Sequence, residues 1–520
     1  MTVPDSSLKL VSQTKVKISK IIGDLENSKA PFWYFILAFY AAVTLRNFIE
    51  TISTKVDIYP LGLAHWYISY SALALTFIVF LYLVSKTPVE KIAKTILPGF
   101  LFLITAPIID LIVSRGQGIS MNYLLPFSLR DLLQRFFTYF GNYQDFAITP
   151  GIRVEFAIGL LAAFIYLYIK NSDFLKSLWQ TFLFYATIFV FLILPFIIKE
   201  AALLLGLMFN YTDLLFIDFY ALLILIMGGL FFYFWDKKYF LRLLGDMRYL
   251  RQASFIMMLF LGVAVGLASS QNGFSLTLNN LFDFIFAPLS LFFAFGFSII
   301  TNNIADFRID KISNPERPLV SGDIKPETYQ KFAWLFLAGA MFYSLLVSAA
   351  AFFLILLFMA SYFIYSMPPF RFKRVPVLSK LAISFNYLVS LIIGYLVINP
   401  RLDSFPSYLW PIFLLGITGA LNMIDLKDFS GDKAEGIATL PVLLGLKWAK
   451  MIISLLVFIA YATMYFLFGA LGIPLFWFFV FLALGAMQAA LINRKEYTET
   501  PMLWLGACSL GLLIFLAWLY

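Results

Sequence analysis

The sequence predicts an all-α polytopic membrane protein, and three observations support this prediction. Of the 520 residues, 62% are hydrophobic and 13% are charged, whereas roughly a quarter of an average soluble domain is charged. The apolar residues form about fifteen runs, each close to the length that spans a bilayer. Lys and Arg gather in alternate connections between these runs. Despite the net charge of +9, this composition excludes soluble enzymes, disordered proteins and nucleic-acid-binding domains.

The first part of the chain predicts a membrane unit of about six helices. Residues 1–30 are polar and basic, and they lack the apolar core and cleavage site of a signal peptide. Apolar runs then fill residues 31–235, at about 31–50, 62–85, 95–114, 153–169, 176–198 and 214–235. No motif indicates a role for this unit. We expect His65 to be a satisfied interfacial residue, and we expect the acids of this unit to lie mostly near helix ends: Asp110, Glu155, Glu200, Asp213 and Asp218.

A basic stretch at residues 236–251, expected to be a cytoplasmic linker, separates this unit from residues 252–520. Residues 332–365 are too long for one span and have basic flanks on both sides, so we predict two crossings there. No repeat relates the two parts of the chain. The second part therefore predicts a nine-helix bundle, with runs at about 253–270, 281–301, 332–348, 350–365, 378–398, 407–424, 449–468, 473–492 and 502–519.

The distribution of Lys and Arg predicts the orientation of the chain. When the N-terminus is placed in the cytoplasm, the cytoplasmic segments carry 30 of these residues and the other side carries 8. An excess of this size follows the positive-inside rule. We therefore expect a multi-pass protein of a prokaryotic-type cell membrane, with the N-terminus in the cytoplasm and Tyr520 outside.

Two segments concentrate carboxylates at expected cytoplasmic helix ends. Both have a spacing of three and then four residues, which places side chains on one face of a helix. The first stripe contains Asn303, Asp306 and Asp310, and the second contains Asp425, Asp428 and Asp432. If the stripes face each other, their carboxylates cannot all stay ionised without a cation. Magnesium binds through one or two carboxylates plus substrate phosphates, so the pattern indicates a metal-bound diphosphate. The alternative is that both segments are solvated loop ends.

A third segment begins at Tyr365 and lies on the same expected side of the membrane. Arg371 and Lys373 in this segment could contact phosphate oxygens, and Arg317 could do the same beyond the first stripe. The alternative is that these cations reflect the positive-inside rule alone.

Residues 240–520 resemble the UbiA superfamily of intramembrane prenyltransferases. The first family signature, Asn-Asp-x-x-Asp-x-x-x-Asp, is matched by Asn302, Asn303, Asp306 and Asp310. The second is matched by Asp425, Asp428, Gly431 and Asp432, and the stretches 314–319 and 436–441 and the Tyr365 segment are also family-like. Position 303 departs from the family, which usually has Asp there. An amide oxygen adds no negative charge, so we expect weaker metal binding in the first stripe.

The resemblance implies nine helices around a lipid-accessible cavity with a polar mouth on the cytoplasmic side. It implies magnesium-dependent transfer of an isoprenyl chain from a prenyl diphosphate to an aromatic or glycerol-lipid acceptor. The expected partners are these two substrates and membrane lipid, with no nucleic acid or protein partner. The alternatives are a membrane transporter and a non-catalytic lipid-binding relative. The expected catalytic and metal residues are Asp306, Asp310, Asp425, Asp428 and Asp432, with Asn303 as a further metal ligand, and the expected diphosphate-binding residues are Asn302, Arg317, Tyr365, Arg371 and Lys373.

Overall fold

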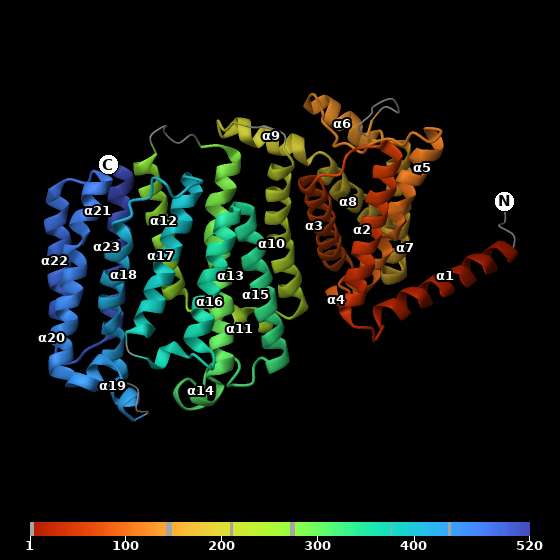
Figure 1. The fold of residues 1–520 in the computed structure, drawn as a ribbon. Helices are drawn as coiled ribbons and strands as arrows, with labels where there is room; N and C mark the ends of the chain where they lie inside the picture. The colour runs from red at the N-terminus through yellow and green to blue at the C-terminus, as the bar shows by residue number, and fades with distance from the viewer. Residues whose placement is uncertain (1–4, 142–147, 209–211, 271–275, 376, 435–437) are drawn as a thin grey trace. The chain divides into compact units, whose positions relative to one another are not determined.

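The computed structural model describes residues 5–141, 148–208, 212–270, 276–375, 377–434 and 438–520 (Figure 1). The elements in these ranges are helices, and no strand longer than an isolated bridge occurs among them. The chain divides into two compact units. Unit 1 contains Met1–Phe240 with Thr277–Asn279, and unit 2 contains Leu241–Leu276 with Asn280–Tyr520. The division at residue 240 falls within the basic stretch 236–251.

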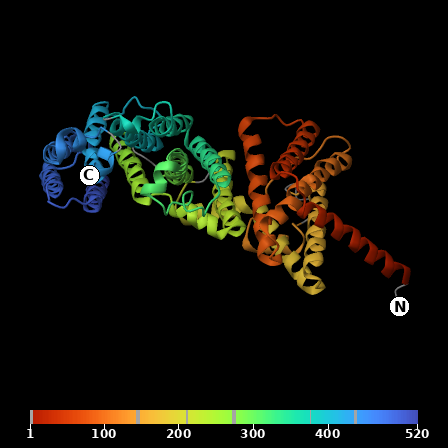
Figure 2. The same ribbon diagram turned by 90° about the horizontal axis from the view of Figure 1, so that it is seen from below.

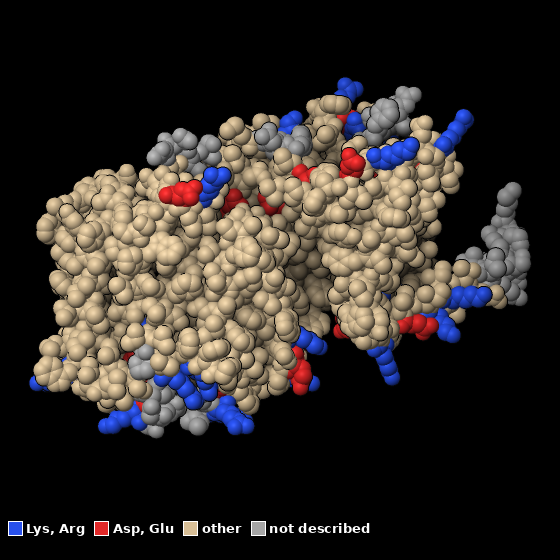
Figure 3. Space-filling view, viewed as in Figure 1, with Lys and Arg blue, Asp and Glu red and all other residues tan. Residues whose placement is uncertain are grey.

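Fifteen helices in the described ranges are long and apolar enough to cross a membrane, six in unit 1 and nine in unit 2. This result confirms the predicted fold class, an all-α protein with many membrane-spanning helices. In Figure 3 the side of unit 2 consists almost wholly of uncharged residues, while Lys and Arg gather at one end. A surface of this kind is expected where lipid surrounds the helices.

Unit 1 begins with a polar helix, α1 (Asp5–Glu26), whose end is held by ion pairing of Glu26 with Lys170. The span predicted at 95–114 starts earlier, at Val89, and is broken near Pro98 because proline interrupts helical hydrogen bonding. The remaining helices of the unit are α2 (Phe32–Thr54), α3 (Pro60–Ser85), α4 (Val89–Gly99), η1 (Phe100–Ile104), α5 (Thr105–Val113), α6 (Leu129–Phe137), α7 (Pro150–Asn171), α8 (Phe174–Leu192), α9 (Leu194–Leu204) and α10 (Asp213–Trp235).

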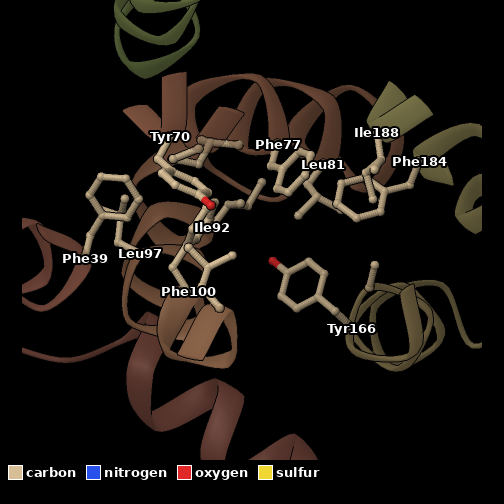
Figure 4. Packing of buried hydrophobic residues seen from close by; sticks show 14 of the residues in the cluster. Phe39, Tyr70, Phe77, Leu81, Ile92, Leu97, Phe100, Tyr166, Phe184 and Ile188 are labelled. Atoms are coloured by element: carbon tan, nitrogen blue, oxygen red, sulfur yellow. The ribbon is translucent and has the colours of Figure 1, made fainter. Parts of the chain in front are cut away.

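The core of unit 1 is rich in aromatic side chains (Figure 4). Phe77 of α3 lies 4.4 Å from Phe184 of α8, measured between ring centroids, and Phe39 of α2 meets Phe100 edge to face at 5.0 Å. Contacts of this kind between rings add to the gain from burying their area.

Unit 2 contains the nine further spans. Its elements are α11 (Lys237–Gly245, at the division between the units), α12 (Tyr249–Ser269), α13 (Leu278–Ala305), α14 (Phe307–Ser313), α15 (Pro326–Val347), α16 (Ala349–Ser366), η2 (Phe372–Arg374), α17 (Leu378–Ile398), α18 (Leu409–Ala420), η3 (Leu421–Ile424), α19 (Asp425–Ala434), α20 (Leu440–Ala462), α21 (Met464–Leu471), α22 (Leu475–Ile492) and α23 (Glu499–Leu519). Figure 2 views this unit from the end that carries α14 and α19.

The long apolar run at 332–365 forms two helices, as predicted. The break lies at Ser348, whose backbone is extended and whose hydroxyl accepts a hydrogen bond from the Ala351 amide. A serine that caps a new helix in this way is the local signal for the break.

Helices α12 and α17 approach each other at two glycines. A Cβ atom at Gly262 would lie 1.9 Å from the Leu391 carbonyl oxygen, and one at Gly394 would lie 1.8 Å from the Leu259 carbonyl oxygen. Real Cβ contacts are never so short, so both positions require glycine. This close pair forms the middle of unit 2 and fixes the walls of the site described below.

We predict that Gly394→Ala lowers the free energy of unfolding of unit 2 by about 1–3 kcal/mol or more, because backbone must move to admit the methyl group. Thermal unfolding in detergent, followed by tryptophan fluorescence, measures the effect. Gly469→Ala is the matched control, because a Cβ there meets no atom within 4 Å. Equal unfolding temperatures for the two variants would contradict the prediction.

Candidate functional site

The first aspartate segment lies at a break between two helices. α13 ends at Ala305, and Asp306 forms the junction with α14. Asn302 and Asp306 face a cavity in unit 2, whereas Asn303 and Asp310 do not line it. The structure thus divides the predicted stripe of positions 303, 306 and 310 between two sides: Asp306 lies on the side of Asn302, one helical turn before it, and Asn303 and Asp310 lie on the other side.

Asp306 is paired with two cations of the third segment. Its side chain forms ion pairs with Arg371, at 2.9 Å, and with Lys373. Asp306 is only 9% exposed, so these cations neutralise a buried charge. Next to it, the Asn302 side-chain oxygen accepts a hydrogen bond of 2.8 Å from the Ser366 hydroxyl.

Asn303 and Asp310 belong to a second cluster on the other side of the segment. Both are almost fully buried, at 2% and 3% exposure, and Arg317 donates hydrogen bonds to both. The Asn303 oxygen also accepts a hydrogen bond of 3.0 Å from Arg248. Its amide nitrogen donates to the Asp246 carboxylate at 2.8 Å and to the Tyr329 hydroxyl oxygen at 2.9 Å. The hydrogen-bonding groups of the Asn303 amide are therefore occupied by protein.

The second aspartate segment is itself a short helix, α19. Asp425, at its first position, is 8% exposed and forms an ion pair with Lys380 of α17. Asp428 is exposed and Asp432 is partly buried one and two turns further along. The three carboxylates repel one another, and the Arg251 guanidinium lies within Coulombic range of Asp428.

The cavity has a volume of about 730 Å³ and is bounded by α12, α13, α16–α18 and α20–α23. Its charged lining residues lie at one end, where α12 begins and α13 ends. They are three cations, Arg248, Arg251 and Lys373, and one carboxylate, Asp306. The rest of the wall is mostly apolar and aromatic, from residues such as Phe255, Phe413 and Leu513. The cavity thus joins a basic mouth to an apolar interior.

The two aspartate segments approach the same end of this cavity. Ile424, the residue before Asp425, lines the cavity, as does Tyr365. Tyr365 lies within Coulombic range of both Asp306 and Asp425. Figure 1 shows α14 and α19 at the same end of unit 2. The structure therefore brings together one carboxylate of each segment, together with the cations of the third segment.

Two arginines of this mouth, Arg248 and Arg371, have left-handed backbones, with φ of 45° and 46°. Residues other than glycine adopt this conformation at a cost of roughly 1–3 kcal/mol, and it persists where surrounding contacts fix it.

Burial lowers the pKa of the Lys373 ammonium below its usual range, although the contact with Asp306 opposes this shift. Burial also raises the pKa of the Asp246 carboxyl, against the effect of its Tyr329 hydrogen bond.

The donor set of the mouth consists of oxygen atoms, which suit a hard cation such as magnesium. In the part of the chain that the structure describes, no group of three or more His, Cys, Asp or Glu side chains is placed to hold a metal alone. Magnesium is usually held by one or two carboxylates together with substrate phosphates rather than by a cage of protein ligands. Asp306 and Asp425, one from each segment, fit this mode of binding.

Several residues of the site were not singled out from the sequence. Arg248 and Arg251 lie in the basic stretch 236–251 and Lys380 lies at the start of the apolar run 378–398, and no motif surrounds any of them. Asp246 is the one carboxylate between Lys237 and Arg251, so its isolation among basic residues was the available signal. Residues 436 and 437 of the family-like stretch 436–441 lie outside the described residues.

We predict that Asp246→Ala lowers the free energy of unfolding by roughly 1–3 kcal/mol, because it leaves the buried Asn303 amide and Tyr329 hydroxyl without their shared acceptor. Thermal unfolding of the purified protein measures the loss. Glu316→Ala removes an exposed acid from the same end of the unit and is the control. A melting temperature unchanged in Asp246→Ala would refute the proposed importance of this acceptor.

Residues 255–516 match the model of the UbiA prenyltransferase family. A digeranylgeranylglyceryl phosphate synthase of Methanobrevibacter smithii is 30% identical over 177 residues, which are 33% of this chain and 62% of that protein. The corresponding synthase of Methanosarcina barkeri is 28% identical over 242 residues, 46% of this chain and 82% of its own. A probable homogentisate phytyltransferase 2 of Oryza sativa is 30% identical over 167 residues, 29% and 42% of the two chains.

Among solved structures, a UbiA homologue from Archaeoglobus fulgidus bound to GPP and Mg²⁺ aligns with 53% of this chain and 98% of its own, at 19% identity and a TM-score of 0.43. The matched region covers less than two thirds of the first two archaeal synthases, at 62% and 60% of their length. The family match itself extends over half of the chain and includes all three site segments. The chain belongs to the UbiA prenyltransferase family.

Proposed function

We propose that this protein is a magnesium-dependent prenyltransferase that moves a geranylgeranyl chain from its diphosphate to the hydroxyl of a glycerol phosphate lipid. One observation carries the proposal: both aspartate segments and three cations border the mouth of a cavity whose interior is apolar. The names of the archaeal relatives, digeranylgeranylglyceryl phosphate synthases, support a glycerol-lipid acceptor over an aromatic one.

The apolar interior and the basic mouth of the cavity would bind different parts of the prenyl diphosphate donor. The isoprenyl chain would lie along the apolar and aromatic wall, where burial of each CH₂ group contributes about 0.8 kcal/mol. The diphosphate would lie at the mouth, near Arg248, Arg251 and Asn302. Arg371 and Lys373, which neutralise Asp306, would contact the phosphate oxygens, and Arg317 would hold the segment that carries Asn303 and Asp310.

In the reaction the bond between the first carbon of the chain and the diphosphate oxygen breaks, and that carbon bonds to the acceptor oxygen. The acceptor loses its hydroxyl proton, and diphosphate leaves. Magnesium, held by Asp306, Asp425, Asp428 and Asp432, would supply neutralisation of the leaving diphosphate. We assign Asp310 a supporting role through Arg317, and we assign Asn303 to the Asp246 cluster because its oxygen already accepts two hydrogen bonds.

Aromatic residues near the mouth would stabilise the allylic cation. Tyr362, Tyr365 and Tyr387 line the cavity beside its charged end. Ring faces attract cations, and a wall of this kind also keeps water from the carbon that carries the charge. We propose that the site faces the cytoplasm, and the excess of Lys and Arg in the segments at this end of unit 2 supports this orientation by the positive-inside rule.

We predict that Asp428→Ala lowers the turnover number by at least about a hundredfold, since each 1.4 kcal/mol of lost transition-state stabilisation is a tenfold loss of rate. Asp428 is exposed, so the variant is expected to fold normally. The assay follows product mass with geranylgeranyl diphosphate and geranylgeranylglyceryl phosphate as substrates. Asp403→Ala, an exposed acid at the opposite end of unit 2, should retain full turnover. Normal turnover of a folded Asp428→Ala protein would overturn the assignment.

Removal of divalent metal is expected to abolish product formation by the unmodified protein. The carboxylates of the mouth would then lack the cation that lets them approach a diphosphate, and like charges would repel. EDTA treatment followed by product analysis tests this expectation, and added magnesium should restore activity. Undiminished activity in EDTA would contradict the proposed metal dependence.

A further inference from the structure

Unit 1 contains a cavity of its own, of about 680 Å³, outside the region that matches the family. It is lined by residues of α1–α4, η1, α7, α8 and α10 and by the chain between α5 and α6. This volume lies within the range of roughly 300–1,000 Å³ that is typical of small-molecule sites. The cavity has a polar end and an apolar end, which lie near opposite ends of the helices that line it.

The polar end lies where α2 finishes and where α3, α7 and α10 begin. Here Asp213 accepts a hydrogen bond from the Tyr59 hydroxyl and lies 2.7 Å from His65 Nδ1. The other imidazole nitrogen, Nε2, is 2.6 Å from the Tyr123 hydroxyl, which is in turn 3.0 Å from the Tyr220 hydroxyl. His65 is thus buried and satisfied. This chain of groups fixes the polar wall but leaves none of its members short of partners.

Two further groups at this end are not satisfied by the protein. Glu155 is 4% exposed, and in the described part of the chain its Oε2 atom has no hydrogen-bond partner. Arg46 forms an ion pair with Glu50 and donates to Asn47, yet its Nε atom has no partner among the described residues. Arg46 and Glu155 both line the cavity and lie within Coulombic range of each other. A buried polar group without a partner costs roughly 1–3 kcal/mol, so a polar group that entered the cavity and bonded to these atoms would be stabilised by a similar amount.

The opposite end is apolar. Phe77 and Leu81 of α3, Phe100 of η1 and Phe184 of α8 line it (Figure 4). Tyr166 faces them from α7, and its hydroxyl is satisfied by Glu26 at 2.9 Å. A hydrocarbon chain that extends from the polar end would therefore meet mostly apolar side chains and aromatic rings.

We propose that this cavity binds a lipid whose head group is an uncharged hydroxyl and whose single chain lies along the apolar wall. A hydroxyl both donates and accepts, so it can donate to Glu155 and accept from Arg46 Nε. An ammonium group could only donate, and a fully ionised phosphate could only accept.

The charges of the two cavities support this choice of head group. The cavity of unit 1 is lined by three carboxylates, Glu50, Glu155 and Asp213, against Arg46 and His65. It offers no surplus of positive charge to a phosphate. The cavity of unit 2 is lined by three cations and one carboxylate, the arrangement that a diphosphate requires. The protein therefore has two lipid cavities that differ in the head group they accept.

The test uses the purified full-length protein and a photoreactive analogue of geranylgeraniol, a C20 isoprenoid alcohol, with labelled peptides identified by mass spectrometry. We expect label on α3 and α7, competed by excess geranylgeraniol but not by geranylgeranyl diphosphate. Glu155→Gln should weaken binding at these peptides about tenfold, the loss of one charged hydrogen bond. Glu200→Gln, an exposed acid of α9, is the matched control and should bind as the unmodified protein does.

A second variant guards against a folding defect in Glu155→Gln. Ala163→Phe fills the apolar part of the cavity without touching the polar end, and it should abolish labelling of α3 and α7. Label confined to unit 2, label unchanged in both variants, or equal competition by the diphosphate would each overturn the proposal. The first result would mean that water alone occupies the cavity, and the second that lipid binds only to the outer surface.

Discussion

The site of unit 2 depends on the neutralisation of carboxylates that are removed from water. Asp306, Asp310 and Asp425 are each less than a tenth exposed, and each has a cation against it. The penalty for an unpaired ion in such a setting is several kcal/mol, so the cations cannot leave unless another positive charge arrives. Each of these pairs joins different elements, and it therefore also fixes the positions of α14, η2, α17 and α19 around the cavity mouth.

The need to neutralise these buried carboxylates also governs which ligands can bind at the cavity mouth. A diphosphate alone would draw Arg371 and Lys373 away from Asp306 and leave that carboxylate uncompensated. A divalent cation alone would displace the two side chains and leave them without an anion. A diphosphate that arrives together with its metal satisfies both sets of charges at once. Charge balance thus favours the joint binding of donor and metal over the binding of either alone.

Composition and spacing predicted the helical membrane fold and the break within 332–365, because both depend on local pattern. The three-and-four spacing also predicted one continuous stripe, and there it failed. Asn302 lies one helical turn before Asp306 and reaches the cavity with it, whereas Asn303, the next residue of α13, lies on another side of the helix. Lys380 could not be found in advance, because its pairing with Asp425 joins segments 45 residues apart and only the fold brings them together.

The hydrogen-bond partners of position 303 explain why an asparagine suits it better than an aspartate. Its amide nitrogen donates to Asp246, and its oxygen accepts from Arg248 and Arg317. An aspartate there could not donate, and its carboxylate would lie within hydrogen-bond distance of the Asp246 carboxylate, where two like charges in a buried place cannot both stay ionised. One carboxylate, Asp246 at the junction between α11 and α12, therefore lies against the amide nitrogen of Asn303, while the Asp310 carboxylate is held by Arg317. The neutral amide lets Asp246 lie beside Arg248 and Arg317 with no carboxylate at position 303 to repel it.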